Sequence, residues 1–169
     1  QWLLEYTSGR KLGEKEISAL EYAIKEVQKN VDETDQDYLP YLYISRCYII
    51  LGKNDPKSPY NYLALKNSLK ALEISPSFVR TYYEVAQAYL NKKDHENAIK
   101  YFEEAVKLNS TVGLSHWYLG AVYLEIGQVE DGLKTINEAI KYGYSFSESD
   151  TLRLINLYIK NIDSKKLSQ

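Results

Sequence analysis

The chain has 169 residues, of which 44% are apolar and 26% charged, and its acidic and basic side chains nearly cancel at a net charge of -2. Folding buries roughly two-thirds of the surface of a chain of this length, which is enough for one domain with a core. The near-neutral charge gives no sign of the basic patch typical of nucleic-acid binding, so we expect no nucleic-acid partner. The longest apolar run, Cys47 to Leu51, is far shorter than the ~20 residues of a membrane helix, so we expect no membrane insertion.

The first predicted element is a helix over residues 14–30, because four apolar residues recur at helical spacing on one face. These residues are Ile17, Leu20, Ile24 and Val27. A short apolar stretch over residues 2–6 and a break over 7–13 precede the helix. Together they predict a degenerate N-terminal hairpin over residues 1–37.

Residues 38–78 predict a second hairpin of helices. Its first helix carries Tyr41, Ile44, Ser45 and Tyr48, and its second carries Ala64, Ser68, Ala71 and Leu72. Between them lies an insertion near residues 52–60 that is rich in the turn formers Gly, Pro, Asn, Asp and Ser. We interpret this insertion as a solvent-exposed loop, with a binding role as the alternative.

The segments 79–112 and 113–146 align with each other at an offset of 34 residues. Large residues align with large ones and small with small, and each segment has two stretches of helical spacing separated by a polar turn. The matched pairs include Val85 with Leu119, Ala86 with Gly120, Tyr89 with Tyr123, Ile99 with Leu133, Phe102 with Ile136, and Ala105 with Ala139. Each segment therefore predicts two antiparallel helices.

The last predicted element, within residues 147–169, is a capping helix over 151–162. Ser147 and Ser149 are both candidates for its N-cap. We expect Leu152, Ile155 and Ile159 to lie on its buried side, because the end of a repeat array must shield its last apolar face.

The repeat resembles the tetratricopeptide repeat, whose pattern contains an aromatic residue, Leu-Gly, Tyr and then Ala, an aromatic residue and Ala. One unit matches at Tyr82, Ala86, Tyr89, Ala98, Phe102 and Ala105, and the other at Leu119, Gly120, Tyr123 and Ala139. His116 holds the first aromatic place of the later unit and Trp117 follows it, so the pattern leaves open which ring packs between the layers. The resemblance implies an all-α fold in one domain over 1–169: a right-handed α-solenoid of about three full repeats between the degenerate hairpin and the capping helix.

No pattern predicts catalysis, a metal site or a cofactor. Neither His95 nor His116 has a second ligand at metal-binding spacing, and Leu133 breaks the only phosphate-loop-like stretch, Gly127 to Thr135. Cys47 is the single cysteine, in a mostly apolar segment, and is interpreted as a small buried residue rather than a reactive thiol. We expect a non-enzyme without cofactors. The cysteine content barely separates the cytoplasm from the periplasm. The compartment therefore stays open, with a cytoplasmic domain and a soluble domain of a membrane-anchored protein as the alternatives.

The resemblance also implies a binding site, because the first helices of such repeats line a concave groove that holds a protein or peptide. The family's contact places correspond here to Leu42, Arg46, Ile49, Arg80, Tyr83, Gln87, Asn91, Trp117, Leu124 and Glu125. Arginines can pair with a carboxylate, and Gln and Asn can bond an extended peptide backbone. As the alternative, Leu42, Ile49 and Leu124 contact neighbouring helices and Tyr83 packs between layers.

The leading hypothesis is therefore a non-catalytic scaffold for protein–protein interaction. Residues 75–84 and 113–120 also resemble, less specifically, the soluble repeat tails of bacterial O-antigen ligase or polymerase membrane proteins. That alternative implies membrane spans before Gln1. The ends of a solenoid can also stack, so weak self-association is a further hypothesis, with Trp2 as a candidate contact.

Overall fold

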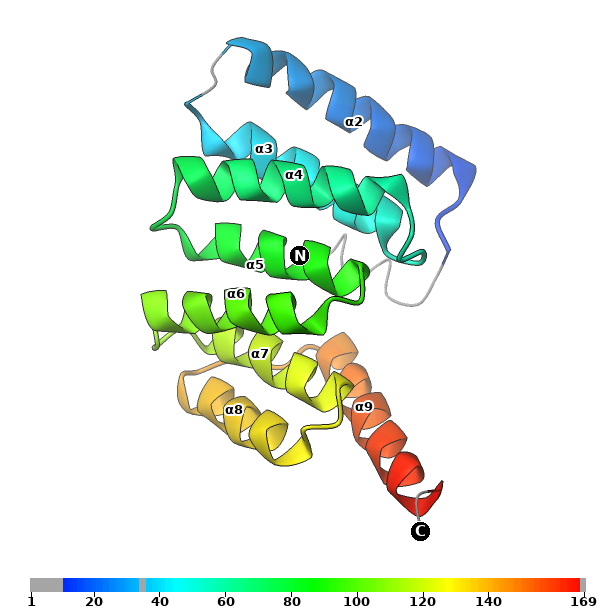
Figure 1. The fold of residues 1–169 in the computed structure, drawn as a ribbon, viewed down its shortest axis with the longest axis vertical. Helices are drawn as coiled ribbons and strands as arrows, with labels where there is room; N and C mark the ends of the chain where they lie inside the picture. The colour runs from blue at the N-terminus through cyan, green and yellow to red at the C-terminus, as the bar shows by residue number, and fades with distance from the viewer. Residues whose placement is uncertain (1–10, 34–35, 168–169) are drawn as a thin grey trace. The chain divides into compact units, whose positions relative to one another are not determined.

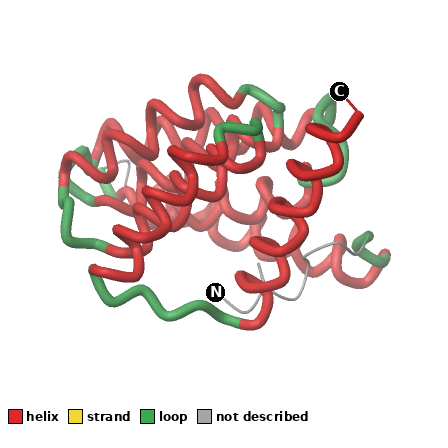
Figure 2. Tube along the Cα trace, turned by 90° about the horizontal axis from the view of Figure 1, so that it is seen from below, coloured by secondary structure: helices red, strands yellow, loops and turns green. Residues whose placement is uncertain are grey.

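The computed structural model describes residues 11–33 and 36–167, and the secondary structure within those ranges is helical throughout (Figure 2). The helices are α2 (Glu14–Glu33), α3 (Tyr38–Gly52), α4 (Pro59–Ile74), α5 (Val79–Asn91), α6 (His95–Leu108), α7 (Gly113–Glu125), α8 (Val129–Lys141) and α9 (Glu148–Leu167) (Figure 1). The predicted all-α helical-repeat fold of the solenoid class is confirmed. The stretch 2–6 and Trp2 lie outside the described residues.

The chain divides into two compact units, one up to Tyr101 and one from Phe102, with the division inside α6. Helices α3, α5 and α7 begin at the residues where the sequence predicted repeats to begin, Tyr38, Val79 and Gly113. The grouping of all residues into a single domain stays a prediction. Within the described residues, no helix combines the length and the apolarity needed to cross a membrane.

The same turn joins the two helices in successive hairpins. Lys93 after α5 and Gly127 after α7, 34 residues apart, both adopt a left-handed backbone, with φ of 62° and 87°. In each turn the next amide donates back into the first helix: Asp94 N to the Tyr89 carbonyl oxygen at 3.0 Å, and Gln128 N to that of Tyr123 at 2.9 Å. These bonds satisfy carbonyls that a helix end leaves unpaired, and they reverse the chain within a few residues.

In the first unit, α3 packs against both α4 and α5, and α2 packs on α3. Ile49, Ala64 and Ala88 are buried together at this contact, with Tyr48 and Leu65 packed against them. Small side chains let the helices approach closely. Ser45, which is fully buried, also donates its hydroxyl to the Ala64 carbonyl oxygen across the α3/α4 contact at 3.0 Å.

The insertion between α3 and α4 is held at its ends. Asn61, in the first turn of α4, is 1% exposed and donates its side-chain amide to the Asp55 carbonyl oxygen at 2.8 Å. Gly52 ends α3 directly beside it, and a Cβ added at Gly52 would lie 2.0 Å from Asn61 Oδ1. Residues 54–57 are exposed, in agreement with the interpretation as a solvent loop.

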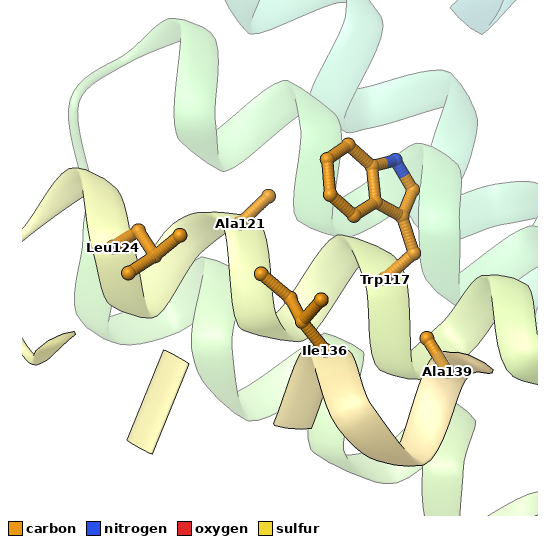
Figure 3. Close-up of a cluster of buried hydrophobic side chains, with 5 residues drawn as sticks. All are labelled: Trp117, Ala121, Leu124, Ile136 and Ala139. Carbon is orange, nitrogen blue, oxygen red and sulfur yellow. The ribbon is translucent and has the colours of Figure 1, made fainter. Parts of the chain in front are cut away.

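In the second unit, α7 and α8 form a hairpin around one buried cluster. Trp117, Ala121 and Leu124 of α7 pack with Ile136 and Ala139 of α8 (Figure 3). The backbones approach so closely at Gly120 that a Cβ there would lie 2.7 Å from Ile136 Cγ1 and 3.0 Å from the Gly132 carbonyl oxygen. This contact explains the small residue that the repeat places at Gly120.

Helix α9 begins with a reciprocal cap, in which the Ser147 hydroxyl accepts from Asp150 N at 3.2 Å and the Asp150 carboxylate accepts from Ser147 N at 3.0 Å. Ser147 is therefore the N-cap, of the two serines that the sequence left open. Leu154 and Leu157 of α9 pack against the α7/α8 core.

The predicted buried side of α9 is wrong. Leu152, Ile155 and Ile159 are 55%, 48% and 50% exposed. The reason is that α9 carries two apolar stripes, and only the stripe of Leu154 and Leu157 is flanked by polar groups that bond to α7.

Candidate functional site

The ten predicted contact residues fall on three helices. Leu42, Arg46 and Ile49 lie on α3, and Arg80, Tyr83, Gln87 and Asn91 lie on α5, all in the first unit. Trp117, Leu124 and Glu125 lie on α7 in the second unit.

Five of the ten have no surface to offer a partner. Leu42, Ile49, Asn91, Trp117 and Leu124 are 4%, 2%, 5%, 1% and 0% exposed. For Leu42, Ile49 and Leu124 the alternative of contact with neighbouring helices is the better description. For Asn91 and Trp117 the prediction of a binding role is corrected by their contacts inside the fold.

Asn91 bonds its own chain rather than a peptide. Its side-chain amide donates to the Ile49 carbonyl oxygen in the last turn of α3 at 2.7 Å and to Asn61 Oδ1 at 3.2 Å. It thus connects α5 both to the end of α3 and to the start of α4. A buried amide with partners on two other helices stabilises the fold and is unavailable to a ligand.

Trp117 is a core residue of the second unit. Its ring stacks on Tyr144 at a centroid distance of 5.8 Å and meets Phe146 edge-on at 5.1 Å. His116 is buried as well, stacked on Tyr142 at 5.2 Å with Nε2 2.9 Å from the Ser110 carbonyl oxygen. Both rings therefore pack inside, which answers the question that the repeat pattern left open.

The remaining predicted residue of α7 is held by α9. The Glu125 carboxylate lies 3.6 Å from Arg153 Nη2, and its backbone carbonyl accepts from Lys160 Nζ at 3.4 Å. Asn161 of α9 donates to the neighbouring Leu124 carbonyl oxygen at 2.8 Å. Helix α9 and residues 144–146 therefore occupy, within this unit, the side of α7 that the prediction gave to a partner.

In the first unit, four predicted residues keep accessible surface: Arg46, Arg80, Tyr83 and Gln87. We call them, together with Tyr43 of α3, the α3/α5 face. Tyr43 is 56% exposed and lies one helical turn before Arg46. The sequence prediction missed Tyr43 because it used only the family's usual contact places, although helical spacing from Arg46 would have included it.

A buried ion pair organises this face. Arg46 Nη2 of α3 donates to the Glu84 carboxylate of α5, which is 3% exposed. Burial raises the pKa of Glu84, and the charges of Arg46 and Arg80 oppose that rise. Arg46 Nε is buried without a hydrogen-bond partner among the described residues. Two arginines and one carboxylate leave this group with a net positive charge.

Cys47 follows Arg46 and is half-buried. Burial raises the pKa of its thiol, and the Arg46 charge only partly offsets this effect. A raised pKa keeps the thiol protonated near neutral pH, which agrees with the interpretation as a packing residue.

An open cavity of about 460 Å³ lies elsewhere in the first unit, where α2 meets α3 and α4. Tyr48 and Tyr60 stack on its wall at 5.9 Å, and the Tyr60 hydroxyl donates to Glu21 of α2 at 3.0 Å. Lys25 and Lys29 also line it. No sequence pattern predicts this cavity, because its shape depends on how α2 packs on α3 and α4. Among the residues that the structure describes, no group of His, Cys, Asp and Glu could hold a metal ion.

Stacked antiparallel helix pairs with small residues at their contacts place the chain among the helical-repeat proteins. The tetratricopeptide repeat family model matches residues 79–111, which span α5 and α6. Residues 79–111 therefore form a tetratricopeptide repeat, within a fold of the helical-repeat class. None of the curated proteins compared with the chain matches it.

Solved structures of such proteins share the fold. TTC0263, a thermophilic TPR protein of Thermus thermophilus, is similar with a TM-score of 0.67 and 15% identity, over 86% of this chain and 73% of that one. MamA is similar with a TM-score of 0.63 and 15% identity, over 73% and 68%. A MamA structure labelled MSR-1 is similar with a TM-score of 0.59 and 18% identity, over 73% of this chain and 67% of that one. Tetratricopeptide-repeat proteins are generally scaffolds for protein interaction.

Proposed function

We propose that this chain is a non-catalytic protein-binding module whose α3/α5 face holds an extended peptide that carries a carboxylate. The observation that supports this proposal most is the Arg46–Glu84 pair, which fixes one guanidinium at the surface between the two helices. Arg80 is exposed one turn before Glu84 on α5 and adds a second guanidinium. A guanidinium fork binds a carboxylate with two parallel hydrogen bonds.

The rest of the face suits a peptide backbone. Tyr43 and Tyr83 offer rigid rings with a polar tip, and such side chains bind with little loss of conformational entropy. Gln87, half-buried one turn after Tyr83, has both a donor and an acceptor for main-chain groups. Helix α7 is not part of this site, because α9 and residues 144–146 cover Trp117 and Glu125.

The test is a library of ten-residue peptides with and without acidic residues or a free terminal carboxylate, followed by calorimetry on the peptides that bind. We expect acidic peptides to be enriched, and Arg80→Ala and Tyr83→Ala each to weaken their binding about tenfold or more. Tyr62→Ala, at a 66% exposed position on α4, is the matched control and should leave affinity unchanged. Peptides that bind Arg80→Ala and Tyr83→Ala as well as the unmodified chain would refute the site.

The alternative of a tail on a membrane glycan polymerase or O-antigen ligase gains no support from the proteins found to be similar. A scaffold on the α3/α5 face requires no such parent protein. The binding test therefore does not depend on what the chain is attached to.

A further inference from the structure

Helix α9 presents a row of apolar side chains away from its own unit. Leu152, Ile155, Ile159 and Ile162 are 55%, 48%, 50% and 39% exposed, and we call them the α9 outer stripe. Tyr158, beside the row, is 47% exposed. In Figure 1 one side of α9 faces α7, and none of the described helices of the unit lies along its other side. Four large aliphatic side chains in one row on a helix are uncommon on a surface without a partner.

The register of α9 shows what kind of surface this is. Asn161 of α9 donates to the Leu124 carbonyl oxygen of α7 at 2.8 Å, just as Asn91 of α5 donates to that of Ile49 of α3 at 2.7 Å. In both cases the helix that donates comes two helices later in the chain than the helix that accepts. Helix α9 therefore docks on α7 in the same manner as α5 docks on α3, as the first helix of a further repeat.

When α9 is aligned with α5 so that Asn161 matches Asn91, the three residues Leu152, Ile155 and Ile159 match Tyr82, Val85 and Tyr89. That side of α5 is covered by the next helix: Val85 is fully buried, and Tyr89 stacks on Tyr101 of α6 at 5.6 Å. The α9 outer stripe is thus the side on which the first helix of a repeat meets an antiparallel neighbour. Among the described helices, none takes that place beside α9.

We propose that a second copy of this chain covers the stripe, with the two α9 helices packed antiparallel to each other. The four residues are spaced by three, four and three, which is the spacing of a coiled-coil seam. The row is also symmetric about its centre. An antiparallel pair therefore brings Leu152 opposite Ile162 and Ile155 opposite Ile159. The two helices of one repeat also run antiparallel to each other.

Two features favour α9 of a second copy over a helix of the ordinary repeat type. Asn156 stands where α5 has Ala86 and α7 has Gly120, the place of closest helix approach. At Gly120 even a Cβ would lie 2.7 Å from Ile136, so Asn156 excludes an equally close neighbour. Large side chains along a seam set helices toward the upper end of the usual interaxial distance of about 8–10 Å, and the flanking residues Asn156 and Tyr158 carry no charge that would repel a second copy.

The association is tested by analytical ultracentrifugation of the full chain from 5 to 500 µM. A seam of four residues per copy falls below the 1,200–2,000 Å² of ordinary interfaces, so we expect a dimer with a dissociation constant on the order of 10–100 µM. Ile155→Asp and Ile159→Asp should each weaken it at least tenfold. Because both side chains are half-exposed in the single chain, the far-UV circular dichroism should not change.

Tyr62→Asp, on α4 of the other unit, is the control and should dimerise normally. The orientation is tested in a Cys47→Ser background by mixing Leu152→Cys with Ile162→Cys under mild oxidation. An antiparallel pair yields the mixed disulfide when both variants are present and little of either homodimer. A chain that stays monomeric to 500 µM, a dimer that tolerates Ile155→Asp, or homodimeric disulfides at residue 152 would each overturn the proposal.

Discussion

Replacing Trp117 by Ala separates the two roles that this residue could have. Trp117 is 1% exposed, stacked on Tyr144 and in edge contact with Phe146, so its loss removes a ring from the core. The substitution leaves about 150 Å² of apolar surface unburied, which at ~25 cal/mol per Å² corresponds to ~4 kcal/mol. Measured Phe or Trp to Ala substitutions in cores cost about 3–5 kcal/mol. We therefore expect a loss of about 3–5 kcal/mol in the free energy of unfolding.

Urea unfolding followed by far-UV circular dichroism measures this loss without relying on tryptophan fluorescence. Tyr83→Ala, at a half-buried position on the α3/α5 face, is the control and should cost less than about 1 kcal/mol. Since Trp117 and Tyr144 are in contact, removing both should cost less than the sum of the separate losses. A Trp117→Ala loss below about 1 kcal/mol, together with weaker peptide binding, would refute the core assignment and restore Trp117 to the binding site.

Three further predictions follow from local contacts. Gly52→Ala should lower the free energy of unfolding in urea by about 1–3 kcal/mol, because its Cβ would overlap Asn61 Oδ1. This loss should be smaller when Asn61→Ala is also present. Equal losses in both backgrounds would refute the contact. Asn91→Ala should lower the free energy of unfolding by about 1–3 kcal/mol, because it leaves the Ile49 carbonyl oxygen and Asn61 Oδ1 without their donor. An unchanged midpoint of urea unfolding would contradict this. Burial and the hydrogen bond to Glu103 raise the pKa of Tyr123 from 10.0 to about 12, so the folded chain retains this proton more strongly than the unfolded chain and stability falls as pH rises through that window. Melting temperatures between pH 9 and 12 should therefore decline less steeply for Tyr123→Phe, and an identical decline would argue against the raised pKa.

The repeat itself could be predicted from the sequence because its constraints are local and periodic. Helix starts at Val79 and Gly113, and the small residue at Gly120, follow from an offset comparison and from the need for close helix approach. The loop after Gly52 was visible in the turn formers that compose it. Each of these features depends on residues that are near one another in the chain or one repeat apart.

The candidate site could be predicted only in part, because accessibility depends on contacts outside the repeat pattern. Trp117 stands at a usual contact place, but Tyr144 and Phe146 lie in a connecting segment that has no counterpart in the repeat signature. Asn91 looks like a free amide in the sequence, and only the end of α3 beside it supplies the carbonyl that it binds. Glu84 gave no signal as the partner of Arg46, because the two residues are 38 positions apart and meet only when α3 and α5 pack.

The orientation of α9 shows how polar groups decide between two apolar faces. The stripe of Leu152, Ile155 and Ile159 has more large apolar side chains than the stripe of Leu154 and Leu157, so apolar content alone would favour burying the former. Asn161, by contrast, donates to the Leu124 carbonyl oxygen at 2.8 Å only when its own side faces inward, whereas its bond to the Leu157 carbonyl oxygen lies within α9.

A buried hydrogen bond is worth about 0.5–1.5 kcal/mol, and an unpaired buried group costs about 1–3 kcal/mol. Turning α9 to bury the other stripe would forfeit the bond to Leu124 and separate Arg153 from Glu125. Asn161 and Arg153 together hold the helix in this rotation, which leaves the more continuous aliphatic row on the outside. The surface that we assign to a second copy is therefore a consequence of how α9 is anchored to its own chain.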